Sequence, residues 1–233
     1  MKKKKGNIMS YAGTFGALLI LFVILALASP NFLKFDNMMS ILKQTTFNAL
    51  LSTGMLLCLI TAGIDLSVGA NATFAACMCG FLVTRGVTNS FVLIVVALLT
   101  GTLVGMVNGL LLTRLHLPHP FVSTLGMKNV LWGAALLVTA SKMISFSGIN
   151  GLLWLGSSTM KGFPVSFVIV ILIYILMHVL LTKTALGRSI YCAGGNPEAT
   201  RLSGINSANV LTFCYILSGF MAALAGIVSI GRS

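Results

Sequence analysis

The stretch FVLIVVALLTGTLVGMVNGLLLT, residues 91–113, contains no charged side chain. An α-helix crosses the hydrocarbon core of a bilayer with about 20 predominantly apolar residues. The stretch is long enough for one such crossing, and it lacks the polar face that a helix on the surface of a soluble domain carries. It therefore predicts a transmembrane helix.

The composition of the whole chain agrees with a membrane protein. Of the 233 residues, 57% are hydrophobic and 8% are charged, and the mean hydropathy is +1.02. Soluble domains carry about 25% charged residues, so this chain has too few polar side chains to cover a soluble globule. We expect an all-α polytopic membrane protein with about seven transmembrane helices, at residues 11–29, 45–62, 70–84, 91–113, 123–141, 165–182 and 210–230.

Small residues recur along two of these segments. Gly101, Gly105 and Gly109 follow one another every four residues, and Gly219 and Gly226 lie in the last segment. Residues four apart share a helix face, and a face without side chains lets another helix backbone approach closely. We expect these glycines to mediate helix packing within one subunit; a dimerisation motif is the alternative.

The positive charge is distributed as membrane anchors rather than as a nucleic-acid surface. The net charge is +12, and four of the 15 cations are Lys2 to Lys5. The sequence has no basic stripe with interleaved aromatic residues, so nucleic acid is not an expected partner. The lysine cluster predicts a cytoplasmic N-terminus. The first apolar segment ends in an Ala-x-Ala sequence, so a cleaved signal peptide is the alternative to an uncleaved first span.

A carboxylate flanked by glycines lies between the second and third segments, in the sequence TAGIDLSVGA at residues 61–70. A carboxylate at membrane depth is a candidate proton or cation site, so an ion-coupled secondary transporter using Asp65 is one alternative for the function. Gly63 and Gly69 indicate instead a chain reversal at the membrane surface. In that case we expect Asp65 or Ser67 to cap the following helix at the interface.

The longest polar connection, residues 183–209, contains the sequence AGGNPEATRLSGI at 193–205. Asn196 fits an N-cap, Pro197 the first helical position, Glu198 the first turn, and Gly204 a helix stop. A two-turn helix is marginal alone in water, so we expect it to dock on a partner; a self-contained surface turn is the alternative. The sequence contains no Gly-Lys-Ser or Gly-Lys-Thr, which excludes a P-loop ATPase.

Side chains for metal binding or catalysis are sparse. His116 and His119 lie in one turn and His178 in the sixth apolar segment, without the third and fourth ligands that a metal site needs. The five cysteines lie mostly in apolar segments, where cysteine acts as a small hydrophobic residue. A membrane-embedded protease would combine His178 with Ser67 or Ser218, but no spacing selects either serine. We expect no catalytic residue, no metal site and no cofactor in this chain.

The two polar sequences closely resemble the two signatures of the simple-sugar ATP-binding cassette permeases, the ribose, xylose, arabinose and galactose group. The likeness extends over the chain, including residues 185–188 and 217–226. It implies an importer permease bundle that translocates a monosaccharide. It also implies that the second signature docks on an ATP-hydrolysing subunit through Gly195, Asn196, Pro197, Glu198, Ala199, Arg201, Leu202 and Gly204. The first signature is then a structural turn near the pathway, formed by Gly63, Asp65, Ser67 and Gly69.

The resemblance also implies an assembly and a location. The partners would be two ATP-binding cassette subunits, which carry ATP and Mg²⁺, a second permease subunit in a homodimer or heterodimer, an extracytoplasmic sugar-binding protein and the lipid bilayer. The chain would be a multi-pass protein of the bacterial plasma (inner) membrane and not itself an enzyme. We expect one permease domain over residues 1–233 with a cytoplasmic coupling loop at 183–209. Family members continue with further spans, so we expect this chain to be truncated at its C-terminus.

Overall fold

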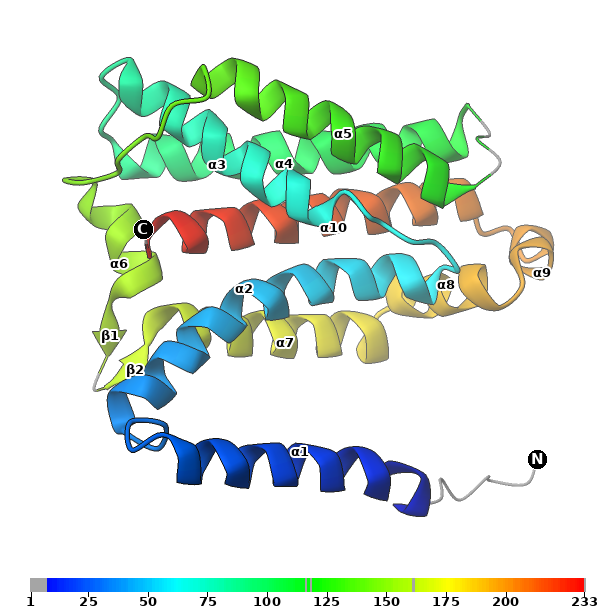
Figure 1. Cartoon of the computed structure of the whole chain (residues 1–233). Coiled ribbons are helices and arrows are strands. Elements are labelled where there is room, and N and C mark those ends of the chain that lie inside the picture. Colours follow the sequence, from blue (N-terminus) through cyan, green and yellow to red (C-terminus); the bar gives the residue numbers. More distant parts are fainter. Residues whose placement is uncertain (1–7, 116, 118, 161, 233) are drawn as a thin grey trace. The chain divides into compact units, whose positions relative to one another are not determined.

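The computed structural model describes residues 8–115, 117, 119–160 and 162–232, with side chains from residue 13 onward. Lys2 to Lys5 and His116, which carried expectations about orientation and metal binding, lie outside these residues. The described chain is almost entirely helical, as Figure 1 shows, and the all-α prediction is therefore confirmed.

Every predicted apolar segment forms a helix. The helices are α1 (Ile8–Ala28), α2 (Phe35–Ile60), α3 (Val68–Thr84), α4 (Ser90–Thr113), α5 (Pro120–Thr139), α6 (Asn150–Ser157), α7 (Val165–Lys183), α8 (Ala185–Gly195), α9 (Pro197–Leu202) and α10 (Ser207–Ile230). A two-residue antiparallel pair, β1 (Thr159–Met160) and β2 (Phe163–Pro164), connects α6 to α7 and pairs Thr159 with Pro164 and Met160 with Phe163. Within the described residues, α4, α5, α7 and α10 are long and apolar enough to cross a membrane, while α3 and residues 13–28 of α1 are shorter apolar helices.

The described residues divide into two compact units between Leu42 and Lys43. In the first unit, α1 and the start of α2 are joined by a tight turn. The rings of Phe22 and Phe32 meet edge to face with their centroids 5.3 Å apart. The side-chain amide of Asn37 donates a hydrogen bond of 2.7 Å to the backbone oxygen of Phe32. These contacts fix the turn locally.

The second unit, from Lys43 onward, is built around α10. More than half of the residues of α10 are buried, including Tyr215, Ser218 and Ile227. In Figure 1, α10 lies between the group formed by α3, α4 and α5 and the group formed by α7, α8 and the later part of α2. Three apolar clusters join α10 to these neighbours. Because α10 contacts most of the other helices of the second unit, a displacement of α10 would also displace them.

The glycine face of α4 packs directly on α10. A methyl group added at Gly101 would stand 2.5 Å from Cβ of Ala223, and one at Gly109 would stand 2.9 Å from Cα of Thr212. At Gly105 the added group would collide with the backbone oxygen of Tyr215. The glycine face is therefore occupied by a helix of the same chain. Gly219 lies in this contact, whereas Gly226 contacts the backbone of α3 at Ala72.

The two ends of the bundle are formed by different short helices. At one end, α6 packs on the last turn of α10 through Gly156 and Gly231, and Lys43 donates a 2.7 Å hydrogen bond to the backbone oxygen of Ser157 at the end of α6. At the opposite end, α8 and α9 form a helical hairpin between α7 and α10 (Figure 1). This second end holds the second sequence signature.

Candidate functional site

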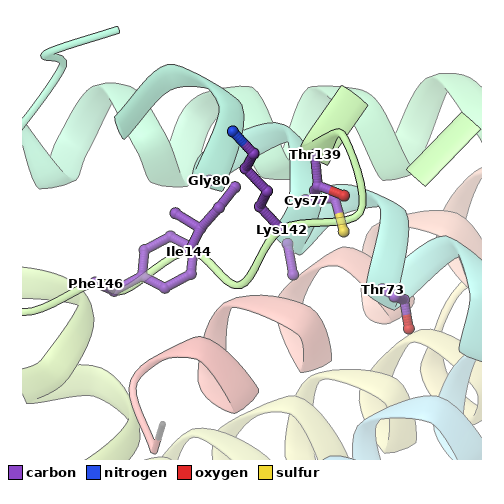
Figure 2. Close-up of a pocket in the computed structure, with 8 residues that line it drawn as sticks. Thr73, Cys77, Gly80, Thr139, Lys142, Ile144 and Phe146 are labelled. Carbon is purple, nitrogen blue, oxygen red and sulfur yellow. The ribbon is translucent and has the colours of Figure 1, made fainter. Parts of the chain in front are cut away.

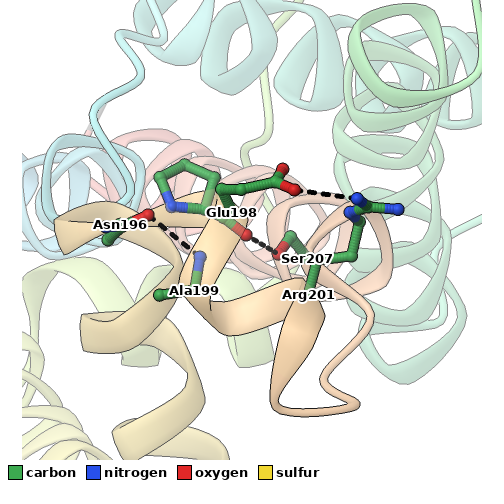
Figure 3. Close-up of polar contacts among 6 residues, drawn as sticks. Asn196, Glu198, Ala199, Arg201 and Ser207 are labelled. Carbon is green, nitrogen blue, oxygen red and sulfur yellow. Dashed lines mark hydrogen bonds and ion pairs between the residues drawn. The ribbon is translucent and has the colours of Figure 1, made fainter.

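Helix α9 forms for the local reasons that its sequence suggests. The side-chain oxygen of Asn196 accepts a hydrogen bond of 3.0 Å from the backbone amide of Ala199, which makes Asn196 the N-cap (Figure 3). Pro197 follows at the first helical position, where its missing amide hydrogen costs nothing. Gly204 has a φ of +79°, the left-handed conformation that ends helices and that glycine adopts without strain.

The outer face of α9 is polar except for one large apolar side chain. Glu198 and Arg201 form an ion pair of 2.8 Å, and their side chains are 68% and 71% exposed (Figure 3). An exposed pair of this kind contributes little to stability, so it is available to a partner. Leu202 is 78% exposed beside it. One exposed apolar side chain therefore stands beside two exposed charges at this end of the bundle.

Two grooves flank α9. One, of about 330 Å³, lies between α8 and α9 and includes Cys192, Asn196 and Ser203 in its lining. The other, of about 470 Å³, lies between α9 and the start of α10 and includes Glu198 and Arg201. The hydroxyl of Ser207 donates a hydrogen bond of 3.4 Å to the backbone oxygen of Pro197 across this second groove (Figure 3). Helix α9 therefore forms a ridge between two grooves at the end of the bundle.

The preceding helix α8 was missed by the sequence interpretation, which treated residues 183–209 as a loop with one short helix. The hydroxyl of Thr184 caps α8 by accepting a 3.0 Å hydrogen bond from the amide of Gly187. Its buried positions, Gly187, Ile190 and Ala193, are spaced three residues apart, which is a helical face. The threonine followed by this spacing was the signal that could have revealed it.

The first signature begins with a chain reversal after α2. Ala62 adopts a left-handed conformation with a φ of +58°, and the amide of Gly63 donates a hydrogen bond of 2.8 Å to the backbone oxygen of Cys58. A methyl group at Gly63 would stand 2.8 Å from the hydroxyl oxygen of Tyr215. Gly63 is thus needed for close packing, whereas nothing lies within 4 Å of the corresponding position at Gly69.

Asp65 is the centre of a buried hydrogen-bond network. One carboxylate oxygen accepts hydrogen bonds from the amide of Ser67 at 3.0 Å and from its hydroxyl at 2.6 Å. The other accepts one of 2.9 Å from the hydroxyl of Ser218 on α10. The side-chain amide of Asn108 on α4 donates a hydrogen bond of 2.8 Å to the Ser67 hydroxyl. The network ties the turn to two helices at once.

The position of this network corrects the expectation that Asp65 caps α3 at the membrane interface. Ser218 is at the middle of the 24-residue helix α10, and Asp65 is only 2% exposed. The carboxylate therefore lies at the depth of the middle of the bundle, because the chain turns back into the bundle after Gly63. Ser67 occupies the N-cap position of α3, but its side chain makes no capping hydrogen bond and instead donates to Asp65.

A further cavity, which the sequence did not indicate, lies between α3 and the connection that follows α5. Its volume is about 170 Å³, and its lining includes Cys77, Lys142 and Phe146. Figure 2 shows Ile144 of this connection next to Gly80 of α3. A methyl group at Gly80 would stand 2.8 Å from Cδ1 of Ile144, so the missing side chain lets the connection pack closely on α3.

The remaining histidines do not come together. His119 is exposed at the start of α5, and His178 is exposed on α7, where it lines a groove of about 400 Å³ with Ser52, Thr53 and Tyr174. Among the described residues, no group of three or more His, Cys, Asp and Glu side chains could hold a metal ion. The hydroxyl of Ser218, one of the two serines considered for a protease, donates to Asp65 rather than to a histidine.

Comparison with known proteins identifies the family. Residues 37–232, which include both signatures, match the family described as "Branched-chain amino acid transport system / permease component". The chain belongs to this permease family. The ribose import permease protein of Haemophilus influenzae is 34% identical over 230 residues, which are 97% of this chain and 71% of that protein. No solved structure matches the chain.

Two further relatives of the permease come from Escherichia coli K12. Its ribose import permease protein is 36% identical over 93% of this chain and 68% of its own length. Its galactofuranose transporter permease protein is 36% identical over 91% of this chain and 64% of its own length. These matches confirm the resemblance to simple-sugar ATP-binding cassette permeases and argue against the ion-coupled secondary transporter. The permease is a multi-pass membrane protein and a transport subunit.

Proposed function

We propose that this chain is the membrane-spanning permease subunit of an ATP-driven importer and translocates a simple sugar of the ribose type. The named relatives include permeases for ribose and galactofuranose. The observation that carries the proposal is the position of α9, a short capped helix of the second signature that stands exposed at one end of the bundle (Figure 3).

In this proposal α9 docks on an ATP-binding cassette subunit, which supplies ATP and Mg²⁺. Leu202 provides the apolar anchor and the Glu198–Arg201 pair provides charges at its rim. The cap at Asn196 and the left-handed Gly204 define the ends of the docking helix. Gly195, Pro197 and Ala199 shape its start. The contact would need only a few apolar and charged groups, as is usual for protein interfaces.

The transport cycle uses two permease subunits that enclose a pathway between them, and an extracytoplasmic binding protein delivers the sugar. The lysine cluster predicts a cytoplasmic N-terminus. In this proposal α1, α2, α3, α4, α5 and α7 each cross the membrane, and this even number of crossings returns the chain to the cytoplasm at α8 and α9. ATP binding and hydrolysis in two partner subunits then move α9 and alternate the access of the pathway.

The function is tested in proteoliposomes that contain the permease, its ATPase subunits and the sugar-binding protein. We expect ATP-dependent uptake of radiolabelled ribose, and no uptake when the ATPase subunits are omitted and an ion gradient is applied. Uptake driven by the ion gradient alone, and lost in Asp65→Asn, would instead support the secondary transporter.

The docking contact is tested by deleting residues 196–204. The deletion should abolish the stimulation of ATP hydrolysis by sugar-loaded binding protein, because the contact helix is removed. Stimulated hydrolysis that survives this deletion would rule out α9 as the coupling helix.

A further inference from the structure

The two sequence signatures contact each other in the folded chain, although about 130 residues separate them in the sequence. The contact lies between Gly194, near the end of α8, and the end of α2. A methyl group at Gly194 would collide with the backbone oxygen of Ile60 and would stand 2.8 Å from the carbonyl carbon of Ile60 and 3.1 Å from Cα of Thr61. Backbone therefore meets backbone at this point, with no side chain between.

An apolar cluster surrounds this contact. Ile190 and Ala193 of α8 are buried with Leu57 of α2 and with Val210 and Cys214 of α10. Close-packed interiors transmit displacement because they have little free volume. A movement of α8 would therefore reach the end of α2 rather than be absorbed by flexible side chains.

Beyond the contact, residues 61–67 are held at both ends. The hydroxyl of Thr61 donates hydrogen bonds of 2.9 Å to the backbone oxygen of Cys58 and 3.3 Å to that of Leu57. At the other end, Asp65 accepts from Ser218 at the middle of α10. The hydroxyl of Ser67 accepts from Asn108 of α4. Breaking such buried hydrogen bonds would leave buried polar groups unsatisfied, which is costly, so the segment stays attached when its ends are displaced.

We propose that residues 60–67 relay the movement of the α8–α9 hairpin to the middle of α10, with Gly194 as the input contact and the Asp65–Ser218 hydrogen bond as the output contact. The inference rests on the proposed function and assigns these two contacts a positioning role in coupling. The inference also explains why the first signature lies in the middle of the bundle. There it takes up the movement of the second signature and passes it to α10.

The input contact is tested with Gly194→Ala in the complete importer, reconstituted with its ATPase subunits and binding protein. We expect the complex to assemble and its basal ATP hydrolysis to persist, while the amount of ribose taken up per ATP hydrolysed falls about tenfold, a typical coupling magnitude. The control is Gly126→Ala on α5, where nothing lies within 4 Å of the added methyl group; this variant should keep the wild-type ratio.

The output contact is tested with Ser218→Ala, Asp65→Ala and the double variant. Each single change removes the same hydrogen bond, so the double variant should lower the uptake per ATP no further than the more affected single variant. Asp65→Asn should restore most of the ratio, because its amide can donate a hydrogen bond to the Ser218 hydroxyl. This rescue distinguishes a positioning role from a requirement for charge.

The outcomes separate this inference from the proposed function. ATP-driven uptake by the wild-type complex tests the function alone. If the wild type transports but Gly194→Ala keeps the wild-type ratio, the input contact is overturned. If Gly194→Ala fails to assemble, Ser218→Ala decides: an unchanged ratio in that variant, or independent effects in the double variant, overturns the relay.

Discussion

Asn196 is the residue on which the exposed helix α9 depends most directly. The helix has only six residues, far fewer than the about 12–15 that an isolated helix needs to persist in water. The side chain of Asn196 satisfies one of its free amide groups, at Ala199. Loss of an N-cap of this kind costs about 1 kcal/mol. Because the helix is so short, we expect this loss to lower the fraction of molecules in which α9 is formed.

We therefore predict that Asn196→Ala lowers the affinity of the permease for its ATPase subunit about fivefold, which corresponds to about 1 kcal/mol. A binding titration of the two purified subunits in detergent measures it. Asn89→Ala is the matched control, because Asn89 caps α4 by accepting from the amides of Phe91 and Val92 but lies at the other end of the bundle. An equal loss of affinity in both variants would contradict the prediction.

The residue scale also shows where sequence reasoning succeeds and where it stops. Asn196, Pro197 and Gly204 could be assigned before the structure, because capping and helix termination depend on neighbours within a few residues. The depth of Asp65 could not be assigned, because it depends on Ser218, which lies 153 residues further along the chain. Glycines around a carboxylate are compatible with a surface turn and with a turn that re-enters the bundle.

At the scale of elements, α4 and α10 make the most extensive helix–helix contact among the described residues. Gly101, Gly105 and Gly109 meet α10 over successive turns, and a side chain at any of them would overlap the partner helix or press on it. Lipid tails are as apolar as the helix surfaces, so the hydrophobic effect does not drive membrane helices together. Such helices associate through close packing instead. The stability of the pair therefore depends on the absence of side chains along this line.

We predict that Gly105→Ala lowers the free energy of unfolding by about 1–3 kcal/mol, the usual cost of inserting atoms into a packed interior. Gly133→Ala on α5 is the control, since nothing lies within 4 Å of the added methyl group. Alanine exceeds glycine in helix propensity by about 1 kcal/mol, so the control should be neutral or stabilising. Denaturation in detergent micelles measures both, and equal effects would contradict the packing argument.

The elements that sequence reasoning missed are short. The apolar helices were predictable because membrane crossing imposes length and composition on them. The helices α6 and α8, with eight and eleven residues, carry no such constraint. They are stabilised by tertiary contacts, such as Gly156 against Gly231 and Gly194 against Ile60. Those contacts join distant parts of the chain and cannot be read from the local sequence, although the Thr184 cap and the spacing after it are a local signal for α8.

At the scale of the whole molecule, an exposed cysteine, Cys192, can report the orientation in the membrane. Cys58, Cys79 and Cys214 are buried, Cys77 is half-buried, and Cys192 on α8 is exposed. Cys192 lies at the end of the bundle that the proposed function places in the cytoplasm, whereas Cys77 lines the cavity beside the connection after α5. The native sequence therefore contains its own probe for topology.

We predict that a membrane-impermeant maleimide modifies Cys192 in inside-out vesicles and leaves it unmodified in intact cells. Mass spectrometry of the labelled peptide measures the modification. Cys192→Ser should remove the labelling seen in inside-out vesicles and leave any labelling of Cys77 unchanged. Modification of Cys192 from outside intact cells would reverse the assigned orientation.

The contact between α4 and α10 also determines where a solute can travel. Two backbones that touch along successive turns leave no lumen between them, and opening a lumen there would separate the two helices. A hydrated sugar must therefore cross along another face of the permease. A displacement of α10 by the proposed relay would therefore carry α4 with it, and the two helices would move as one body beside the pathway.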